Sequence, residues 1–87
     1  MSYRYETEEF NLTPKEQESA RFMLREVEIL NSQRRDNGGW HIRYMTFEGF
    51  KYQFYQQLAT RLVRTWKNLG ISSDGKRAIY GKVVRDS

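Results

Sequence analysis

The chain of 87 residues contains no cysteine. This absence excludes disulfide bonds, thiolate zinc sites and cysteine nucleophiles together. No run of about 18 apolar residues is present, and the first residues, MSYRYETEEF, lack the apolar stretch of a signal peptide. The sequence therefore predicts a soluble protein without a membrane segment. The missing cysteines are also compatible with a reducing, intracellular (cytoplasmic) location.

Acidic residues are missing from one long part of the chain. None lies between Glu48 and Asp74, so 25 consecutive residues carry only positive charge. Residues 1–33 contain four Lys/Arg and seven Glu, a net charge of −3. Residues 34–87 contain eleven Lys/Arg and four Asp/Glu, a net charge of +7. The second half therefore has the charge needed to attract a polyanion.

Proline occurs once, and Pro14 marks the start of a helix. In LTPKEQ, Thr13 can act as the N-cap, Pro14 suits the first helical position, and Glu16 completes a capping box. Apolar residues then recur at steps of three and four, which predicts a helix over residues 14–32. The segment QRRDNGG is expected to end it, because asparagine and glycine tolerate left-handed backbone conformations. The predicted apolar face consists of Ala20, Met23, Leu24, Val27 and Leu30.

A strand and a second helix are expected after this break. The alternation in WHIRYMTF predicts a short, half-buried strand over residues 40–47. Thr46 can cap a helix in which apolar residues keep helical spacing from Phe47 to Leu69. Gly70 would then end this helix in the usual position of a left-handed C-cap.

The two ends of the chain are expected to differ in order. Residues 1–11 alternate tyrosines with polar residues, which fits either an edge strand or a flexible terminal arm. Asp74-Gly75 predicts a tight turn that joins a stub at Ile71 to a strand over residues 77–85. Thirteen aromatic residues would supply much of the core of so small a domain. The predicted fold is α+β: one domain over residues 1–87, with two main helices and a small antiparallel sheet that includes a C-terminal β-hairpin.

Enzymatic and cofactor sites have little support. His41 is the only histidine, and the sequence shows no positioned partner for general base catalysis. A metal site would have to rely on scattered carboxylates, and the glutamates of the first helix suit solvated ion pairs. The segment DNGG contains neither a P-loop nor a dinucleotide fingerprint. The sequence therefore predicts a non-enzymatic protein with no catalytic residue, no metal and no cofactor.

The basic residues of the second half are the one group of side chains whose pattern indicates a function. Arg61, Arg64 and Lys67 step by three along the predicted second helix, which would place them in a strip beside its apolar face. The hairpin and the first loop would add further cations. A basic surface that merely keeps the protein soluble is the alternative. The predicted nucleic-acid-binding residues are Arg34, Arg35, Arg61, Arg64, Lys67, Lys76, Arg77 and Lys82.

Two segments within residues 55–85, LATRLVRTWKNLGI and DGKRAIYGKVV, carry a family resemblance. An amphipathic helix, a glycine-containing turn and a basic strand in this order resemble the C-terminal half of winged-helix DNA-binding domains. The resemblance implies that the helix enters the major groove and that the hairpin forms the wing. It places Arg61, Arg64 and Lys67 on the recognition helix, and Lys76, Arg77 and Lys82 on the wing.

These observations favour a small protein that binds nucleic acid, with duplex DNA preferred, as a regulator or replication accessory. RNA is a further candidate because exposed aromatics such as Tyr44 and Tyr52 could stack on bases, although most rings are expected in the core. The alternative function is a protein-interaction module or inhibitor that docks its basic face on an acidic partner protein. The acidic first helix and basic second helix would also support a homodimer.

Overall fold

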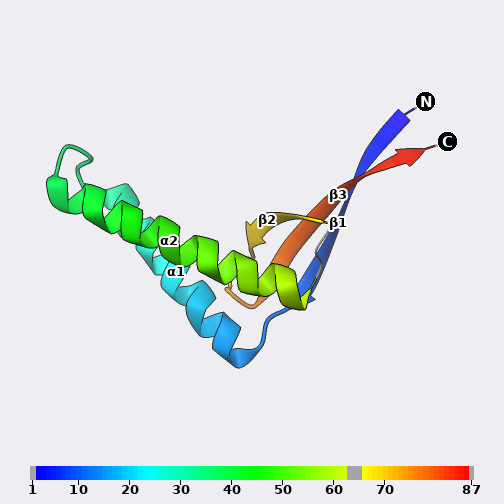
Figure 1. The fold of residues 1–87 in the computed structure, drawn as a ribbon, viewed down its shortest axis with the longest axis horizontal. Coiled ribbons are helices and arrows are strands. Elements are labelled where there is room, and N and C mark those ends of the chain that lie inside the picture. Colours follow the sequence, from blue (N-terminus) through cyan, green and yellow to red (C-terminus); the bar gives the residue numbers. More distant parts are fainter. Residues whose placement is uncertain (1, 63–65, 87) are drawn as a thin grey trace.

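The computed structural model describes residues 2–62 and 66–86. Its elements are β1 (Ser2–Asn11), α1 (Pro14–Ser32), α2 (Gly38–Arg61), β2 (Lys67–Ile71) and β3 (Arg77–Asp86). The two helices run antiparallel as a hairpin, and the three strands form one antiparallel sheet at one end of it (Figure 1). The predicted α+β class, with two helices and a small antiparallel sheet, is therefore confirmed.

Helix α1 begins as the sequence predicts. The Thr13 hydroxyl accepts a hydrogen bond from the Glu16 backbone N–H (3.2 Å), and the Glu16 carboxylate accepts one from the Thr13 backbone N–H (2.8 Å). Both bonds of the capping box are thus present, and they satisfy backbone groups that a helix start leaves unpaired. The helix ends at Ser32, and its buried residues are Ala20, Met23 and Leu30.

The predicted strand over residues 40–47 is wrong, because this segment forms the first turns of α2. Asn37 is the N-cap, and its side chain accepts a hydrogen bond from the Gly39 backbone N–H. The helical period prevails because it brings Trp40 and Phe47 onto α1, where the Trp40 indole N–H donates to the Leu30 carbonyl at 2.7 Å. Ile42, which a half-buried strand would have covered, is 72% exposed instead.

The predicted end of the second helix is also wrong. Helix α2 ends at Arg61, and residues 67–71 form strand β2. Gly70 is therefore not a helix cap, although its φ of +130° is positive. It lies at an irregularity where β2 pairs with β3, and this pairing is a long-range interaction that helical periodicity alone does not reveal.

Strand order in the sheet is β1-β3-β2, so β1 is an edge strand. All ten residues of β1 pair with β3, from Ser2 opposite Asp86 to Asn11 opposite Arg77. The edge-strand interpretation is thus confirmed for residues 2–11, the part of this segment that the structure describes. The predicted turn is confirmed as well: the Gly75 backbone N–H donates to the Ser72 carbonyl, and Gly75 has a φ of +71°.

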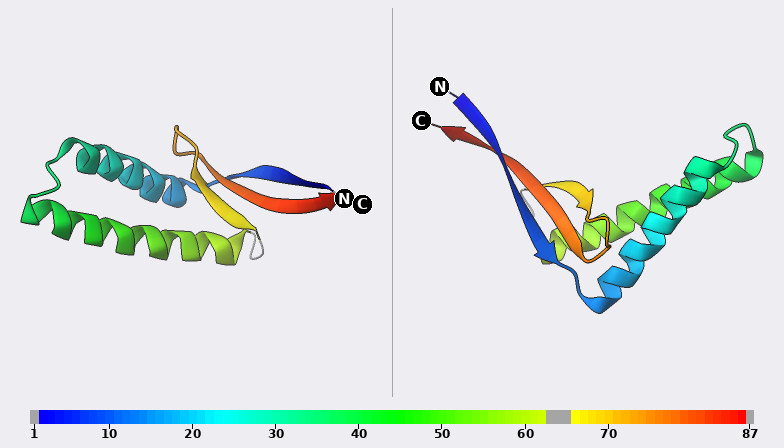
Figure 2. Two further views of the ribbon diagram at one scale, coloured as in Figure 1. Left: turned by 90° about the horizontal axis from the view of Figure 1, so that it is seen from above. Right: turned by 180° about the vertical axis from the view of Figure 1, so that it is seen from behind.

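The core lies where the helical hairpin meets the sheet. Ala78 and Tyr80 of β3 are buried against Met23 of α1 and against Phe54 and Leu58 of α2. Beyond this junction, the outer halves of β1 and β3 project as a twisted two-stranded ribbon with both ends of the chain at its tip (Figures 1 and 2). The molecule measures 51 × 31 × 21 Å. Within the described residues, neither helix has an apolar stretch long enough to cross a membrane.

Candidate nucleic-acid interface

Arg61 acts as a structural clamp. Its guanidinium donates to both oxygens of the Glu16 carboxylate, at 2.7 and 2.6 Å, and to the Asn11 carbonyl at 3.3 Å. It therefore ties the last turn of α2 to the end of β1 and to the capping box of α1. Burial raises the pKa of Glu16, but hydrogen bonds from Arg61 and Thr13 outweigh this effect and lower it. The hydrogen bond to Glu16 raises the pKa of Arg61 itself.

The predicted strip of basic residues does not follow one helix. Arg61 is the last residue of α2, Arg64 lies outside the described residues, and Lys67 belongs to β2. Lys67 is exposed and pairs with Gly81 across the sheet. The strip is absent because α2 ends at Arg61. Residues three apart share a face in a helix, but Lys67 lies in a strand, where side chains alternate between two faces.

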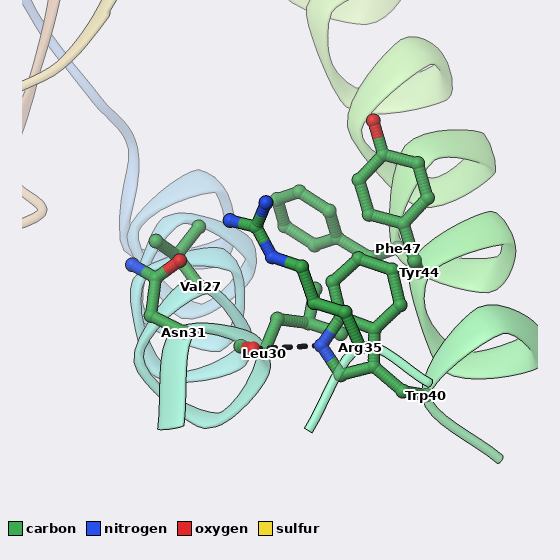
Figure 3. Close-up of a pocket in the computed structure, with 7 residues that line it drawn as sticks. All are labelled: Val27, Leu30, Asn31, Arg35, Trp40, Tyr44 and Phe47. Atoms are coloured by element: carbon green, nitrogen blue, oxygen red, sulfur yellow. Dashed lines mark hydrogen bonds between the residues drawn. The ribbon is translucent and has the colours of Figure 1, made fainter. Parts of the chain in front are cut away.

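Arg34 and Arg35 lie far from the other predicted binding residues. They belong to the loop between the helices, at the opposite end of the hairpin from the sheet (Figure 1). Arg34 approaches Asp36 at 3.8 Å, and the Arg35 guanidinium lies 5.8 Å from the centre of the Trp40 ring. Figure 3 shows Arg35 beside Trp40 at a hollow of about 300 Å³ between α1 and α2. These two arginines therefore cannot share one binding site with the cations of the β-hairpin formed by β2 and β3.

The remaining predicted residues lie on the β-hairpin formed by β2 and β3, but not all on the same face of the sheet. Lys76 is exposed in the turn, and Arg77 lies 3.7 Å from Asp74 and 3.9 Å from Glu9. Lys82 lies on the same face as buried Tyr80, two residues away, with its ammonium 4.6 Å from the Trp66 ring centre. The structure therefore brings Lys67 and Arg77 to one face of the sheet and Lys82 to the other, while Lys76 lies in the turn.

One face of the sheet is not covered by either described helix. Side chains alternate along a strand, so residues on the same side as Phe10, Ala78 and Tyr80 meet the helices and their neighbours point away. We call the side that points away the open face. Its residues are Tyr3, Tyr5, Thr7 and Glu9 of β1, Lys67 and Leu69 of β2, and Arg77, Ile79, Gly81, Val83 and Arg85 of β3.

Two tyrosines and three cations characterise the open face. Tyr3 and Tyr5 are 63% and 51% exposed, and Arg85 is the residue opposite Tyr3. The Tyr5 ring lies directly over Gly81, where an added Cβ would stand only 2.6 Å from the ring. Glycine at this position thus lets Tyr5 lie flat on the sheet. Lys67, Arg77 and Arg85 supply positive charge to this face, against the single acidic residue Glu9.

Sequence reasoning missed the two tyrosines as binding residues. It singled out Tyr44 and Tyr52, which lie on α2 and are 39% and 62% exposed. The available signal was the two-residue spacing of Tyr3 and Tyr5, which places both rings on one side of a strand. His41 is exposed on α2, and no group of three metal-ligating side chains occurs in the part of the chain that the structure describes.

Comparison with known proteins returned no relative. No family model matches the chain, and no curated protein or solved structure matches it.

Proposed function

We propose that this protein is a non-enzymatic nucleic-acid-binding protein that holds single-stranded segments on its open face. The observation that carries the proposal is the placement of two exposed tyrosines on one strand beside three cations, on a face that no described helix covers. Tyr3 and Tyr5 would stack on bases. Lys67, Arg77 and Arg85 would contact phosphates.

The physical basis is the combination of ring and charge. Every base has a π-face, so stacking on tyrosine is tolerant of sequence and contributes about 1–3 kcal/mol per base. Residues two apart on a strand lie about 7 Å apart and point the same way, so two rings can each receive a base. Cations beside the rings attract the phosphates of the nucleic acid. The ion pairs that such exposed cations form within the protein contribute little to its stability. The arrangement therefore suits an unpaired strand.

The test is fluorescence anisotropy with labelled single-stranded DNA, single-stranded RNA and duplex DNA. Tyr5→Ala should weaken single-strand binding about tenfold or more, because it removes one stacking platform. If three cations of the wild-type protein contact phosphates, single-strand affinity should fall roughly twentyfold when salt is raised from about 50 to 200 mM. Tyr44→Ala, at the far end of the helical hairpin, is the matched control. Unchanged binding by Tyr3→Ala and Tyr5→Ala would refute the open face as the site.

Duplex DNA is a second candidate because the ribbon of β1 and β3 projects beyond the helices (Figure 2). The major groove admits a two-stranded β-ribbon. In the winged-helix comparison, the hairpin of β2 and β3 would be the wing, with Lys76, Arg77 and Lys82 on it. Tighter binding to duplex than to either single strand, lost on Lys76→Gln and Lys82→Gln, would favour this function.

An acidic protein partner is the remaining alternative, and the salt dependence of binding distinguishes it from nucleic acid. Phosphate binding releases counterions and weakens steeply with salt, as log Kobs falls linearly with log[salt]. No binding to any of the three polymers at low salt would leave the basic side of the hairpin as a docking face for a protein.

A further inference from the structure

Helix α2 carries apolar side chains on the side that faces away from the core. Ile42, Met45 and Tyr52 are 72%, 67% and 62% exposed. Their spacing of three and seven residues places them in one stripe along the helix. The buried residues of the same helix, Phe47, Phe54 and Leu58, occupy the opposite side. Helix α2 therefore has a second face of uncharged residues, on which these three apolar side chains lie among exposed threonines and glutamines.

The outward face of α2 also lacks charge. Between Gly38 and Thr60, the exposed residues of α2 include no Lys, Arg, Asp or Glu. The charged residues of this segment are half-buried and paired: Arg43 with Glu26 at 2.8 Å, and Lys51 with Glu48 at 3.3 Å. Helix α1 is different, because its exposed side carries Lys15, Glu18, Arg21, Arg25 and Glu28. Depletion of charge is what distinguishes the centre of a protein interface from ordinary surface.

Gly49 lies at the middle of this face. Glycine inside a helix is unfavourable relative to alanine, so its presence calls for a reason. The fold of the single chain supplies none, since an added Cβ at Gly49 would meet nothing within 4 Å. A missing side chain at this point would allow a second helix to approach closely.

We propose that the outward face of α2 binds the same face of a second copy of this chain. The face carries no charge, and the same face of a second copy carries none either, so the two can meet without burying an unpaired charge. Antiparallel packing about Gly49 is self-complementary: it sets Ile42 opposite Gln56 of the other copy, and Met45 opposite Gln53, next to Tyr52. Two helical hairpins joined in this way form a four-helix bundle.

The exposed surface is large enough for such a contact. The chain exposes 6535 Å², about 1,100 Å² more than a compact monomer of 10.5 kDa is expected to expose. A standard interface covers about 800 Å² on each partner. The surplus belongs to the whole extended molecule, ribbon included, and it is of the size that one such contact would cover. The proposal is independent of nucleic-acid binding.

Analytical ultracentrifugation of the full chain without nucleic acid tests the proposal. The wild type should sediment as a dimer of two 10.5 kDa chains. Ile42→Glu and Met45→Glu should each weaken dimerisation by roughly a hundredfold or more, because they place a charge inside the contact. Val83→Glu makes the same change at a residue that is 63% exposed on the open face, and should leave the dimer intact.

Register is tested by a second change in the same chain. Adding Gln56→Lys to Ile42→Glu should restore the dimer, since each new glutamate would face a lysine of the other copy. The two positions are 14 residues apart on one helix, about 21 Å, so they cannot pair within a chain. The chain has no other cysteine, so Gly49→Cys should form an intermolecular disulfide on mild oxidation, and Ser32→Cys should not.

Three results would overturn the proposal. One is a wild type that remains monomeric at every concentration. Another is a dimer that survives both charged substitutions on α2 while circular dichroism shows an intact fold. The third is loss of the dimer in Val83→Glu alone, which would move the interface to the sheet. If the charged variants fail to fold, the Gly49→Cys crosslink still decides the question.

Discussion

Arg61 shows how a residue chosen for its charge can serve the fold instead. A bidentate pair with Glu16 and a hydrogen bond to the Asn11 carbonyl connect the end of α2 to the start of α1 and to the end of β1. We expect Arg61→Gln to lower the free energy of unfolding by about 1 kcal/mol, because the pair is only partly shielded from water. Thermal unfolding followed by circular dichroism measures this loss.

Arg77→Gln is the matched control for Arg61→Gln. Its contacts to Glu9 and Asp74 are long, at 3.9 and 3.7 Å, and all three side chains are 45–48% exposed. The substitution should therefore leave stability unchanged and weaken nucleic-acid binding, whereas Arg61→Gln should do the reverse. Weaker binding by folded Arg61→Gln would show that Arg61 contacts the ligand directly.

Glu16 makes part of the stability dependent on pH. Because the folded state lowers the pKa of Glu16 below its ordinary 4.5, the Arg61 pair stabilises the protein fully above about pH 4.5. Stability is then lost as pH falls through the lowered folded-state value. Glu16→Gln should be less stable than the wild type at pH 7, and the difference should shrink at pH 3. A constant difference in the unfolding temperature at both pH values would contradict this assignment.

Gly81 allows a test of the open face that changes none of its aromatic or charged residues to another type. An added Cβ would come within 2.6 Å of Tyr5 and 2.8 Å of Leu69, both at the far ends of side chains. Gly81→Ala should therefore displace the Tyr5 ring at little cost in stability. We expect single-strand affinity to fall while the unfolding temperature changes by only a few degrees. Anisotropy and a thermal melt of the same sample measure both effects.

Helix α1 and the hairpin turn were predictable at the scale of the element because local chemistry defines them. Thr13, Pro14 and Glu16 mark a helix start through bonds between residues three apart, and Asp74-Gly75 marks a turn within four residues. The edge strand was predictable as one of two alternatives. Pairing with β3, at the other end of the chain, selects the strand.

The bounds of α2 were not predictable by the same reasoning. The alternation of Trp40, Ile42 and Tyr44 fits a strand, and contacts with α1, such as that of Trp40 with Leu30, favour the helix. At the other end, helical spacing continues past Arg61, but pairing of β2 with β3 ends the helix. The predicted site was affected by these errors: Lys67 was expected on the second helix in step with Arg61, and it is exposed but lies in strand β2.

The two threonines that the sequence predicts as N-caps, Thr13 and Thr46, test where the helices begin. Thr13→Ala should cost about 1 kcal/mol, because it removes a capping bond, and should lower the unfolding temperature by about 4–8 °C. The Thr46 hydroxyl donates to the Ile42 carbonyl inside α2, so Thr46→Ala should be neutral or slightly stabilising. A loss at Thr46 as large as that at Thr13 would instead support a helix that starts at Phe47.

The whole molecule is extended for its size. Its radius of gyration is 15.5 Å, whereas about 12 Å is typical of a compact chain of this length. If α2 binds a second copy, association stabilises the folded state by mass action, and the unfolding temperature should rise with protein concentration. Ile42→Glu should abolish this dependence. A wild-type unfolding temperature that is independent of concentration would argue against the dimer.

The position of the sheet at one end of the helical hairpin has a consequence for valency. Antiparallel pairing of two α2 helices would set two open faces at opposite ends of the assembly. A short oligonucleotide would then occupy one face at a time, while a longer one could reach both. Once both are spanned, the second contact is intramolecular and avidity rises sharply without any new contact. Affinity plotted against oligonucleotide length should therefore show a step, and the dimer-breaking substitutions on α2 should remove it.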